Sequence, residues 1–305
     1  MTELTLNDRI QEKTAAALGL FDGVHEGHEL ILRNTMLYSL QDYAPAVFTF
    51  RTESIKFKHG KPFEYIYTNR QKLHRLHVKY VLSPDFDDVR SMTGREFAKN
   101  ILVNVMNVGA VVCGDNFRFG ENASCGVDEL RTFGENYGFE VKVVKLGENH
   151  FSSEKYRELL RKGDVEKLYP HNTYSLWGEV VRGNQIGRTI NFPTVNQLYA
   201  ENQLVPKFGV YRTWTFIDEK GFPSITNIGV KPTIKGVRNP LAETHILDFE
   251  GDLYGKNITV EFLEFIRPEM KFSSVGELKN QINEDVLKVK KLINENSHCF
   301  HCAIT

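Results

Sequence analysis

Residues 15–28 read AAALGLFDGVHEGH. The run Ala15–Leu20 is short and apolar, which is typical of a strand that is buried on both faces. Gly23 and Gly27 indicate a turn, and an amphipathic pattern from Gly27 to about Leu40 predicts a helix. A strand that leads through a glycine-rich turn into a helix is the place where α/β proteins bind phosphates. This stretch therefore predicts an α/β domain with a phosphate site at its first turn.

The alternation of apolar runs and helical patterns continues to about residue 165. Further strands are expected at Ala46–Phe50, Tyr80–Leu82, Ala110–Cys113 and Val141–Val144. Helices are expected at Asn69–Leu76, Gly94–Val105 and Asp128–Tyr137, and from the cap pair Ser152 and Ser153 to Gly163. Because strands of this kind alternate with helices, they predict a parallel sheet with helices on both faces.

The pattern changes after about Tyr169. Strands are expected at Trp177–Val181, Val210–Ile217, Ile225–Val230, Glu243–Phe249 and Asn257–Phe265, and a helix at Ser274–Leu292. Successive strands without helices between them predict an antiparallel sheet, and we expect a six-stranded β-barrel followed by a C-terminal helix. Pro170 marks the boundary, so the expected domains are 1–168 and 169–295, with a tail at 296–305.

Composition and charge exclude several classes of protein. The 305 residues include 38 Lys and Arg against 39 Asp and Glu, for a formal net charge of -1, and only four cysteines. A broad nucleic-acid or lipid-binding face normally needs a basic excess, and spanning a bilayer takes roughly 18 consecutive apolar residues, which the chain lacks. We therefore expect a cytoplasmic protein that acts on small molecules, with no nucleic-acid or membrane partner, as a monomer or weak homo-oligomer.

Two histidines follow the first strand. His25 and His28 are three positions apart at a helix entry, so both imidazoles can face one anion, and the neighbouring glycines let the backbone approach it. The alternatives are a loop with two exposed histidines, or a zinc site, for which no third ligand lies nearby. The context of strand, turn and helix favours the anion site.

Three segments in chain order extend this observation. They are GLFDGVHEGH at 19–28, VVCGDNFRFG at 111–120, and FSSEKYR at 151–157 running on to Gly163-Asp164-Val165. Together they resemble the HxGH nucleotidyltransferases in the form used by bacterial FAD synthetases. The resemblance implies a Rossmann-like domain that transfers the AMP of ATP to the phosphate of FMN.

The resemblance also implies roles for single residues. His25, His28 and Arg157 would be catalytic, because adenylyl transfer to an anionic phosphate needs positioning and charge stabilisation rather than a general base. The implied ATP-binding residues are Gly19, Phe21, Asp22, Gly27, Asn116, Ser152 and Ser153.

A second candidate site follows the domain boundary. Residues 178–196 read GEVVRGNQIGRTINFPTVN, in which glycines around an arginine suit a loop that closes on phosphates. A threonine hydroxyl is a frequent Mg²⁺ ligand in triphosphate sites. Taken alone, the stretch favours a barrel hairpin with a purely structural turn.

Further segments of the second domain match in order. They are Pro206 with GVY at 209–211, NIGVKPT at 227–233, ETHILDF at 243–249, GDLYG at 251–255 and RPEMKF at 267–272. With residues 178–196 they resemble the riboflavin kinases, which transfer the γ-phosphate of ATP to the 5′-hydroxyl of riboflavin. An alcohol must lose a proton as it attacks, so a carboxylate base is needed.

This second resemblance implies Glu243 as the base. It implies Thr194 and Asn196 as the Mg²⁺–ATP residues, Gly183, Gly187 and Arg188 as ATP-binding residues, and Arg267 and Glu269 as flavin-binding residues. His245 shares the strand face of Glu243 and is interpreted as a packing or hydrogen-bonding residue, whereas Asp248 lies on the opposite face and is interpreted as structural.

The expected function is bifunctional: Mg²⁺- and ATP-dependent phosphorylation of riboflavin to FMN, and adenylylation of FMN to FAD. Two alternatives remain. FAD synthetases have the pattern T-F-x-P-H-P after the second strand, and in the family this segment helps to hold flavin. The chain departs from that pattern at Thr49–Ser54 and has Glu154 where threonine is usual. These departures suggest a monofunctional riboflavin kinase with a degenerate first domain. The other alternative is a non-catalytic flavin or nucleotide regulator.

Cys299 and Cys302 form a terminal CxxC for which a metal site is not favoured.

Overall fold

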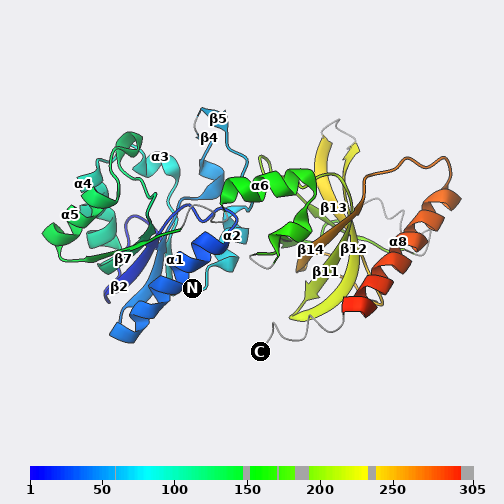
Figure 1. Ribbon diagram of the computed structural model, residues 1–305, viewed down its shortest axis with the longest axis horizontal. Helices are drawn as coiled ribbons and strands as arrows, with labels where there is room; N and C mark the ends of the chain where they lie inside the picture. Colours follow the sequence, from blue (N-terminus) through cyan, green and yellow to red (C-terminus); the bar gives the residue numbers. More distant parts are fainter. Residues whose placement is uncertain (59, 147–151, 170–171, 183–191, 233–237, 297–305) are drawn as a thin grey trace. The chain divides into compact units, whose positions relative to one another are not determined.

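The chain forms two compact units (Figure 1). This computed structural model describes all residues except 59, 147–151, 170–171, 183–191, 233–237 and 297–305. Unit 1 comprises Met1–Tyr156 and Asn202–Leu204, and unit 2 comprises Arg157–Glu201 and Val205–Thr305. The first change of unit falls inside helix α6 (Ser153–Lys162), so this helix belongs partly to each.

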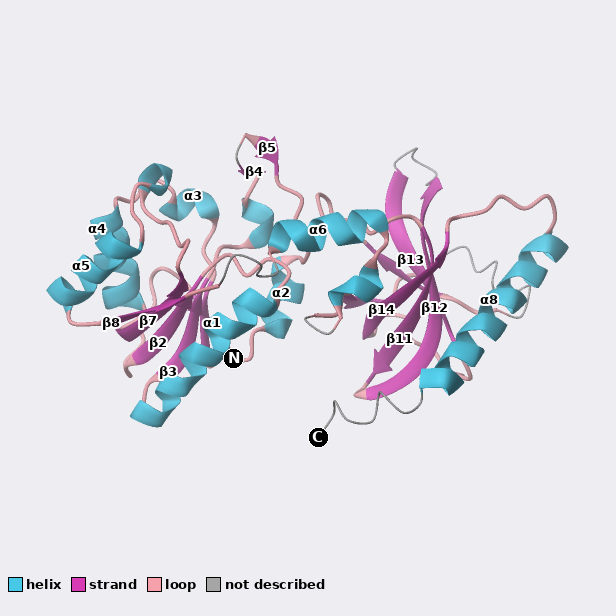
Figure 2. Ribbon diagram, viewed as in Figure 1, coloured by secondary structure: helices cyan, strands magenta, loops and turns pink. Residues whose placement is uncertain are grey.

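Unit 1 is built on a six-stranded parallel sheet (Figure 2). Its strands are β1 (Thr2–Leu4), β2 (Thr14–Leu18), β3 (Ala44–Phe48), β6 (Tyr80–Leu82), β7 (Val108–Gly114) and β8 (Glu140–Val144). They are ordered β1-β6-β3-β2-β7-β8, and every pair is parallel. The order places β2 in the interior of the sheet, between β3 and β7.

Helices cover both faces of this sheet. The α-helices are α1 (Glu26–Met36), α2 (Asn69–Arg75), α3 (Phe86–Val89), α4 (Gly94–Glu96) and α5 (Val127–Tyr137). Shorter helical turns are η1 (Leu37–Gln41), η2 (Thr52–Ser54) and η4 (Glu121–Ala123), and η3 (Phe97–Val105) is a π-helix. The unit also contains a small hairpin of β4 (Phe57–Lys58) and β5 (Lys61–Pro62). Strand β2 shows the two faces directly: Ala16 and Leu18 belong to one apolar core, and Ala15 and Ala17 to the other. The predicted parallel sheet with helices on both faces is confirmed.

Unit 2 is a six-stranded antiparallel sheet curled into a nearly closed barrel. Its strands are β9 (Ser175–Glu179), β10 (Val195–Leu198), β11 (Gly209–Ile217), β12 (Lys220–Pro232), β13 (Arg238–Ile246) and β14 (Asn257–Arg267), in the order β10-β13-β12-β11-β14-β9. The two edge strands approach each other, because Gln197 of β10 donates from Nε2 to the carbonyls of Gly178 (3.0 Å) and Ile258 (3.1 Å). The predicted barrel is confirmed.

Helices flank the barrel. The turn η5 (Val165–Leu168) precedes it, and the long helix α8 (Val275–Asn296) follows it. Val289 of α8 is fully buried in a small core with Val210 and Ile225, which identifies the face of the barrel that α8 covers. None of the helices in the described part of the chain combines the length and the apolar run needed to cross a membrane.

Candidate active sites

The loop between β2 and α1 has an unusual backbone. Phe21, Gly23 and Val24 all have positive φ angles, of 53°, 85° and 40°. A β-branched residue such as Val24 rarely adopts this conformation, and such strain gathers at ligand-binding turns. Gly23 is also needed for space, since a Cβ there would lie 2.8 Å from Cδ1 of Ile66. The sequence of this loop is therefore constrained by its shape.

Two histidines lie against each other where the loop enters α1. His25 is the N-cap residue of α1, and its ring stacks on that of His28 with centroids 3.7 Å apart. The ring of Phe21 packs against His28 at 5.0 Å. Gly27 makes the approach possible, because a Cβ at this position would lie 3.3 Å from the His25 ring. The predicted pair is thus brought together at a helix N-terminus, where the helix dipole and free backbone N–H groups favour an anion.

The start of α6 is joined to the same loop. The Ser153 hydroxyl donates to the Asp22 carbonyl at 2.8 Å, and the Ser152 hydroxyl caps α6 by accepting from the Lys155 N–H at 3.2 Å. The carboxylate of Asp22 accepts from the Ile66 N–H at 2.9 Å, so this buried side chain also holds the segment after β5. Two helix N-termini, those of α1 and α6, therefore meet at one loop.

Two other predicted residues lie on or beside these elements. Asn116 is exposed just after β7, with its Oδ1 close to Gly114 at the end of that strand. Because β7 is the neighbour of β2, Asn116 lies at the same sheet edge as the histidine loop. Arg157 is buried on α6, in unit 2, whereas the side chain of Glu154 is exposed.

A cavity of about 770 Å³ opens in unit 1. Its lining comes from segments that follow the carboxyl ends of β3, β6 and β7, of which β3 and β7 are the neighbours of β2. Aromatic rings dominate this lining: Phe50, Phe57, Phe86, Phe97, Phe117 and Phe119, with Lys56, Arg90 and Arg118 as basic residues. Pockets of this size and character accept flat ligands, and the crevice outside the carboxyl ends of the strands is where open α/β sheets bind them.

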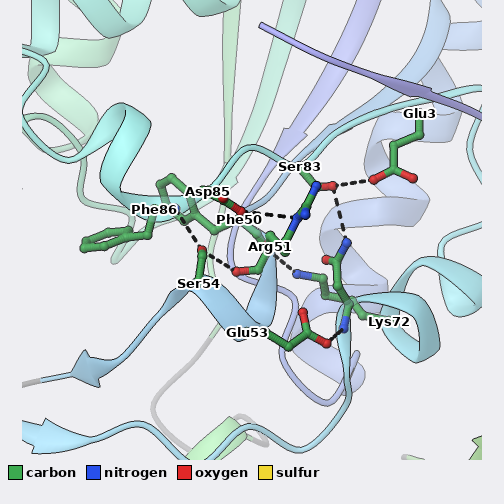
Figure 3. Close-up of polar contacts among 10 residues, drawn as sticks. Glu3, Phe50, Arg51, Glu53, Ser54, Lys72, Ser83, Asp85 and Phe86 are labelled. Atoms are coloured by element: carbon green, nitrogen blue, oxygen red, sulfur yellow. Dashed lines mark hydrogen bonds and ion pairs between the residues drawn. The ribbon is translucent and has the colours of Figure 1, made fainter.

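The segment Thr49–Ser54, which departs from the family pattern, contributes Phe50 and Ser54 to this lining. Figure 3 shows polar contacts of the segment. The Ser54 hydroxyl donates to the Arg51 carbonyl at 2.7 Å and accepts from the Phe86 N–H at 2.8 Å. The Arg51 guanidinium pairs with Asp85 at 3.2 Å. The segment is therefore held by its own polar contacts, and Phe50 remains on the pocket wall, edge-on to Phe86.

The second candidate site lies on the outer face of the barrel. Glu243 of β13 is directly opposite Asn196 of β10 and, on its other side, Asn227 of β12. Side chains at such directly opposite positions share a face with Cβ atoms about 4.5–5.5 Å apart. The alternate residue Thr244 points into the barrel, where its hydroxyl bonds to Thr226. Register therefore brings the predicted base and the predicted Mg²⁺–ATP residue together.

The asparagine in this cluster has acceptor capacity to spare. Asn196 is only 4% exposed, and among the described residues its Oδ1 has no hydrogen-bond partner. A buried amide oxygen without a partner is costly unless a ligand or ion satisfies it. Amide and hydroxyl oxygens are among the ligands that Mg²⁺ takes, so the pair of Asn196 and Thr194 fits that ion.

The turn before β10 is fixed by His245. The Nδ1 atom of His245 lies 2.8 Å from the Pro193 carbonyl, and its ring packs edge-on against Phe192. His245 thus makes the hydrogen bond and the packing contact expected of it, and sets the position of half-buried Thr194. Asp248 pairs with Lys290 at 3.4 Å in an exposed ion pair.

The two predicted flavin-binding residues have different surroundings. Glu269 packs so closely on Gly229 that any Cβ there would collide with its carboxylate, and the Asn227 amide is adjacent. Arg267 instead forms a buried bidentate ion pair with Asp285 of α8, with Nη2 2.7 Å from Oδ2. The first arrangement adds a carboxylate to the Glu243 face, and the second fastens β14 to α8.

Several predicted residues lie outside the described part of the chain: Gly183, Gly187, Arg188, Cys299 and Cys302. Sequence reasoning missed Asn227 as a neighbour of Glu243, although the NIG motif contains it. It also missed the aromatic pocket, since its walls come from segments far apart in the chain. Lys72, a buried lysine that contacts the Phe50 carbonyl at that pocket, lies within the predicted helix Asn69–Leu76 and was not singled out.

Comparison with known proteins agrees with both sites. Residues 7–155 match the family model described as FAD synthetase, and residues 170–293 match the one described as riboflavin kinase. A bifunctional riboflavin kinase/FMN adenylyltransferase of Buchnera aphidicola is 33% identical, over 93% of this chain and 95% of its own. The protein with the same description from Escherichia coli K12 is 34% identical, over 94% and 95%.

A solved structure shows the same fold. It is titled as a macrolide-efflux protein from Streptococcus pneumoniae, and it is 26% identical with a TM-score of 0.79, covering 95% of this chain and 99% of its own. Matches to both family models favour the bifunctional interpretation over a kinase with a degenerate first domain or a non-catalytic regulator. The chain belongs to the family of bifunctional riboflavin kinase/FMN adenylyltransferases.

Proposed function

We propose that the loop between β2 and α1 carries FMN adenylylation and that the Glu243 face of the barrel carries riboflavin phosphorylation. The stacked His25 and His28 rings at the N-terminus of α1 support the first assignment. The placement of Glu243 directly opposite Asn196 supports the second. The functional domains would be 1–168 and 169–295, with a tail at 296–305, and the family matches at 7–155 and 170–293 support that division.

In the adenylyltransferase step, an FMN phosphate oxygen attacks the α-phosphorus of ATP and pyrophosphate leaves. Nothing is deprotonated, so the chain has to hold two anions in line and stabilise the added charge. The imidazoles of His25 and His28 and the amides at the starts of α1 and α6 would do this, together with Arg157. Gly19, Phe21, Asp22, Gly27, Asn116, Ser152 and Ser153 would form the ATP site.

The aromatic cavity would hold the isoalloxazine ring of FMN during this step. It flanks β2 at the same sheet edge as the histidine loop, so a flavin there can present its phosphate toward that loop. Phe50 and Phe117 offer ring faces, and Arg118 or Lys56 offers a charge for the ribityl phosphate. The proposed flavin site would include Phe50 and Ser54, which belong to the segment where the sequence departs from the family pattern.

In the kinase step, the riboflavin 5′-oxygen attacks the γ-phosphorus of ATP, ADP leaves, and the hydroxyl proton passes to a Glu243 carboxylate oxygen. General-base assistance of this kind is worth about 10²- to 10⁴-fold. Thr194 and Asn196 would hold Mg²⁺, which would neutralise phosphate charge. Gly183, Gly187 and Arg188 would contact ATP, and Arg267 and Glu269 the flavin.

Two variants test these assignments. Glu243→Gln should lose riboflavin phosphorylation while retaining ATP binding. Asp248→Asn is the control, because it removes a charge from an exposed ion pair, and it should keep the rate of riboflavin phosphorylation within about twofold of that of the unaltered protein. His28→Asn should lose FAD formation from FMN while retaining the kinase. Chromatography of flavin products, from riboflavin and from FMN, measures both. Full kinase activity in Glu243→Gln would contradict the second assignment, and full FAD formation in His28→Asn the first.

The remaining expectations are also proposals. We infer that the protein works in the cytoplasm as a monomer or weak homo-oligomer, without nucleic acid or membrane. The formal net charge of -1 supports the absence of a nucleic-acid face. Light scattering of the purified chain at several concentrations measures the oligomeric state, and a stable large assembly would contradict this proposal.

A further inference from the structure

A lysine of helix α2 is completely buried beside the aromatic cavity. Lys72 has no exposed surface, and its Nζ donates to the Phe50 carbonyl at 2.5 Å (Figure 3). The same Nζ donates to the Thr49 hydroxyl at 3.1 Å. Both acceptors belong to the segment that follows β3. In the described part of the chain, no carboxylate lies within ion-pair distance of this Nζ. Burial of an amine against neutral acceptors costs free energy that an apolar side chain such as methionine would avoid.

The contacts of Thr49 extend this connection to the nucleotide loop. The Thr49 hydroxyl accepts from Lys72 and donates to the Leu20 carbonyl at 2.9 Å. Leu20 belongs to the loop that carries Phe21, His25 and His28. A single chain of hydrogen bonds therefore runs from helix α2 through the end of β3 to the loop between β2 and α1.

The contact with Phe50 reaches the lining of the aromatic cavity. Phe50 lines the aromatic cavity and packs edge-on against Phe48 and Phe86. Its carbonyl accepts from Lys72, so the position of this ring depends on the lysine. One side chain thus touches the backbone of the flavin wall and, through one hydroxyl, the loop with the two histidines.

The electrostatic surroundings fit a side chain held for its hydrogen bonds. Burial lowers the pKa of Lys72 to about 7, and the only opposing influences are the more distant charges of Asp22 and Glu53. Asp22 lies in the nucleotide loop, and Glu53 accepts from the Asn69 N–H at the start of α2. Whether charged or neutral, the amine can still donate to both acceptors.

We propose that Lys72 is a positioning residue for adenylyl transfer, which fixes the Phe50 wall of the flavin pocket relative to the loop that carries His25 and His28. This inference rests on the proposed assignment of FMN adenylylation to unit 1. Lys72 contacts no reacting atom; it acts through Thr49 and Phe50.

The test compares the unaltered protein with three single variants and one double variant. Lys72→Met keeps most of the volume and removes the donor. Thr49→Val keeps the shape and removes the hydroxyl, while Thr49→Ser keeps the hydroxyl. KM and kcat for FMN and for ATP are measured in FAD synthesis, and riboflavin phosphorylation by the same sample controls for the amount of folded unit 2.

We expect Lys72→Met to raise KM for FMN about tenfold, the effect of one lost hydrogen bond to a charged donor, with KM for ATP within about threefold. Thr49→Val should also raise KM for FMN, whereas Thr49→Ser should keep KM for FMN close to that of the unaltered protein. The double variant should be no worse than Lys72→Met, because both changes break one chain of contacts. A lower fraction of folded unit 1 would reduce kcat alone, so KM separates positioning from stability.

Three results would overturn the inference: an unchanged KM for FMN in Lys72→Met, effects of the two variants that multiply in the double variant, or a Thr49→Ser variant as impaired as Thr49→Val. If Lys72→Met does not fold, Thr49→Val against Thr49→Ser decides alone. Loss of FAD synthesis in the unaltered protein would instead refute the proposed function.

Discussion

His25 and His28 depend on the backbone that carries them. Their rings stack because Gly27 leaves space beside His25 and because Gly23 and its neighbours take positive φ angles before α1 begins. The residues most sensitive to substitution in this loop are therefore those without side chains. The chemistry of the histidines is a consequence of the turn.

Gly23→Ala tests this dependence. A Cβ at φ 85° and 2.8 Å from Ile66 should destabilise unit 1 by about 1–3 kcal/mol and reduce FAD synthesis. Gly138→Ala is the matched control, since Gly138 has a φ of 78° with nothing within 4 Å of its Cβ position. Amide hydrogen exchange in β2 and β7 measures the difference. An equal loss of stability in the two variants would show that the positive φ angle, and not the contact with Ile66, causes the destabilisation.

Lys72 gives the stability of unit 1 a pH dependence. Burial lowers its pKa to about 7, while the unfolded chain keeps a value of about 10.4. Between these values the unfolded chain binds more protons, so stability rises with pH, and below pH 7 the whole cost of burying the charge is present. From pH 7.5 to 9, the free energy of unfolding of the unaltered protein should therefore rise, relative to that of Lys72→Met, by up to about 1.4 kcal/mol per pH unit.

Urea unfolding at pH 7, 8 and 9, followed by circular dichroism, measures this gain. Trp177 and Trp214 are the two tryptophans of the chain and both belong to unit 2, so their fluorescence identifies the transition of that unit. A difference between the two proteins that stays constant across this pH range would contradict the prediction.

At the scale of elements, the barrel and its last helix depend on a buried charge pair. Arg267 at the end of β14 is 16% exposed and Asp285 of α8 is 6% exposed, and they form a bidentate pair. The apolar contact of α8 with the barrel is small, a core around Val289. Removal of one partner would leave the other charge buried and unpaired.

Asp285→Asn should therefore destabilise unit 2 by about 3 kcal/mol, within the range for a broken buried ion pair. It should leave FAD synthesis from FMN within about twofold, because the change is confined to the kinase unit. Tryptophan fluorescence during urea unfolding measures the stability. An unchanged midpoint would show that the apolar contacts alone hold α8.

The same scale shows which elements the sequence reveals. Long apolar runs and regular helical patterns predicted β7, β11, α5 and α8 with boundaries only a few residues off. Strand β1 has three residues and β10 has four, VNQL, so neither is long enough to show a periodic pattern. β10 nevertheless carries Asn196, and only its pairing with β13 places that residue opposite Glu243.

At the scale of the whole molecule, the sequence motifs predicted the reactions better than they predicted the geometry of the sites. Three segments of the first domain and six of the second, taken together, indicated both reactions through their resemblance to known families. The aromatic pocket was beyond prediction because its aromatic residues follow three different strands. The burial of Lys72 was equally hidden, because a lysine in an amphipathic helix normally faces water.

The central claim is that one chain performs two transfers with different phosphates of ATP. Riboflavin is incubated with the protein, Mg²⁺ and ATP labelled either at the γ- or at the α-phosphate, and the flavin products are separated. We predict γ-label in FMN and both labels in FAD, with Glu243→Gln incorporating only α-label when FMN replaces riboflavin. Flavin products that carry γ-label and never α-label would contradict the claim, and so would the absence of label from every flavin.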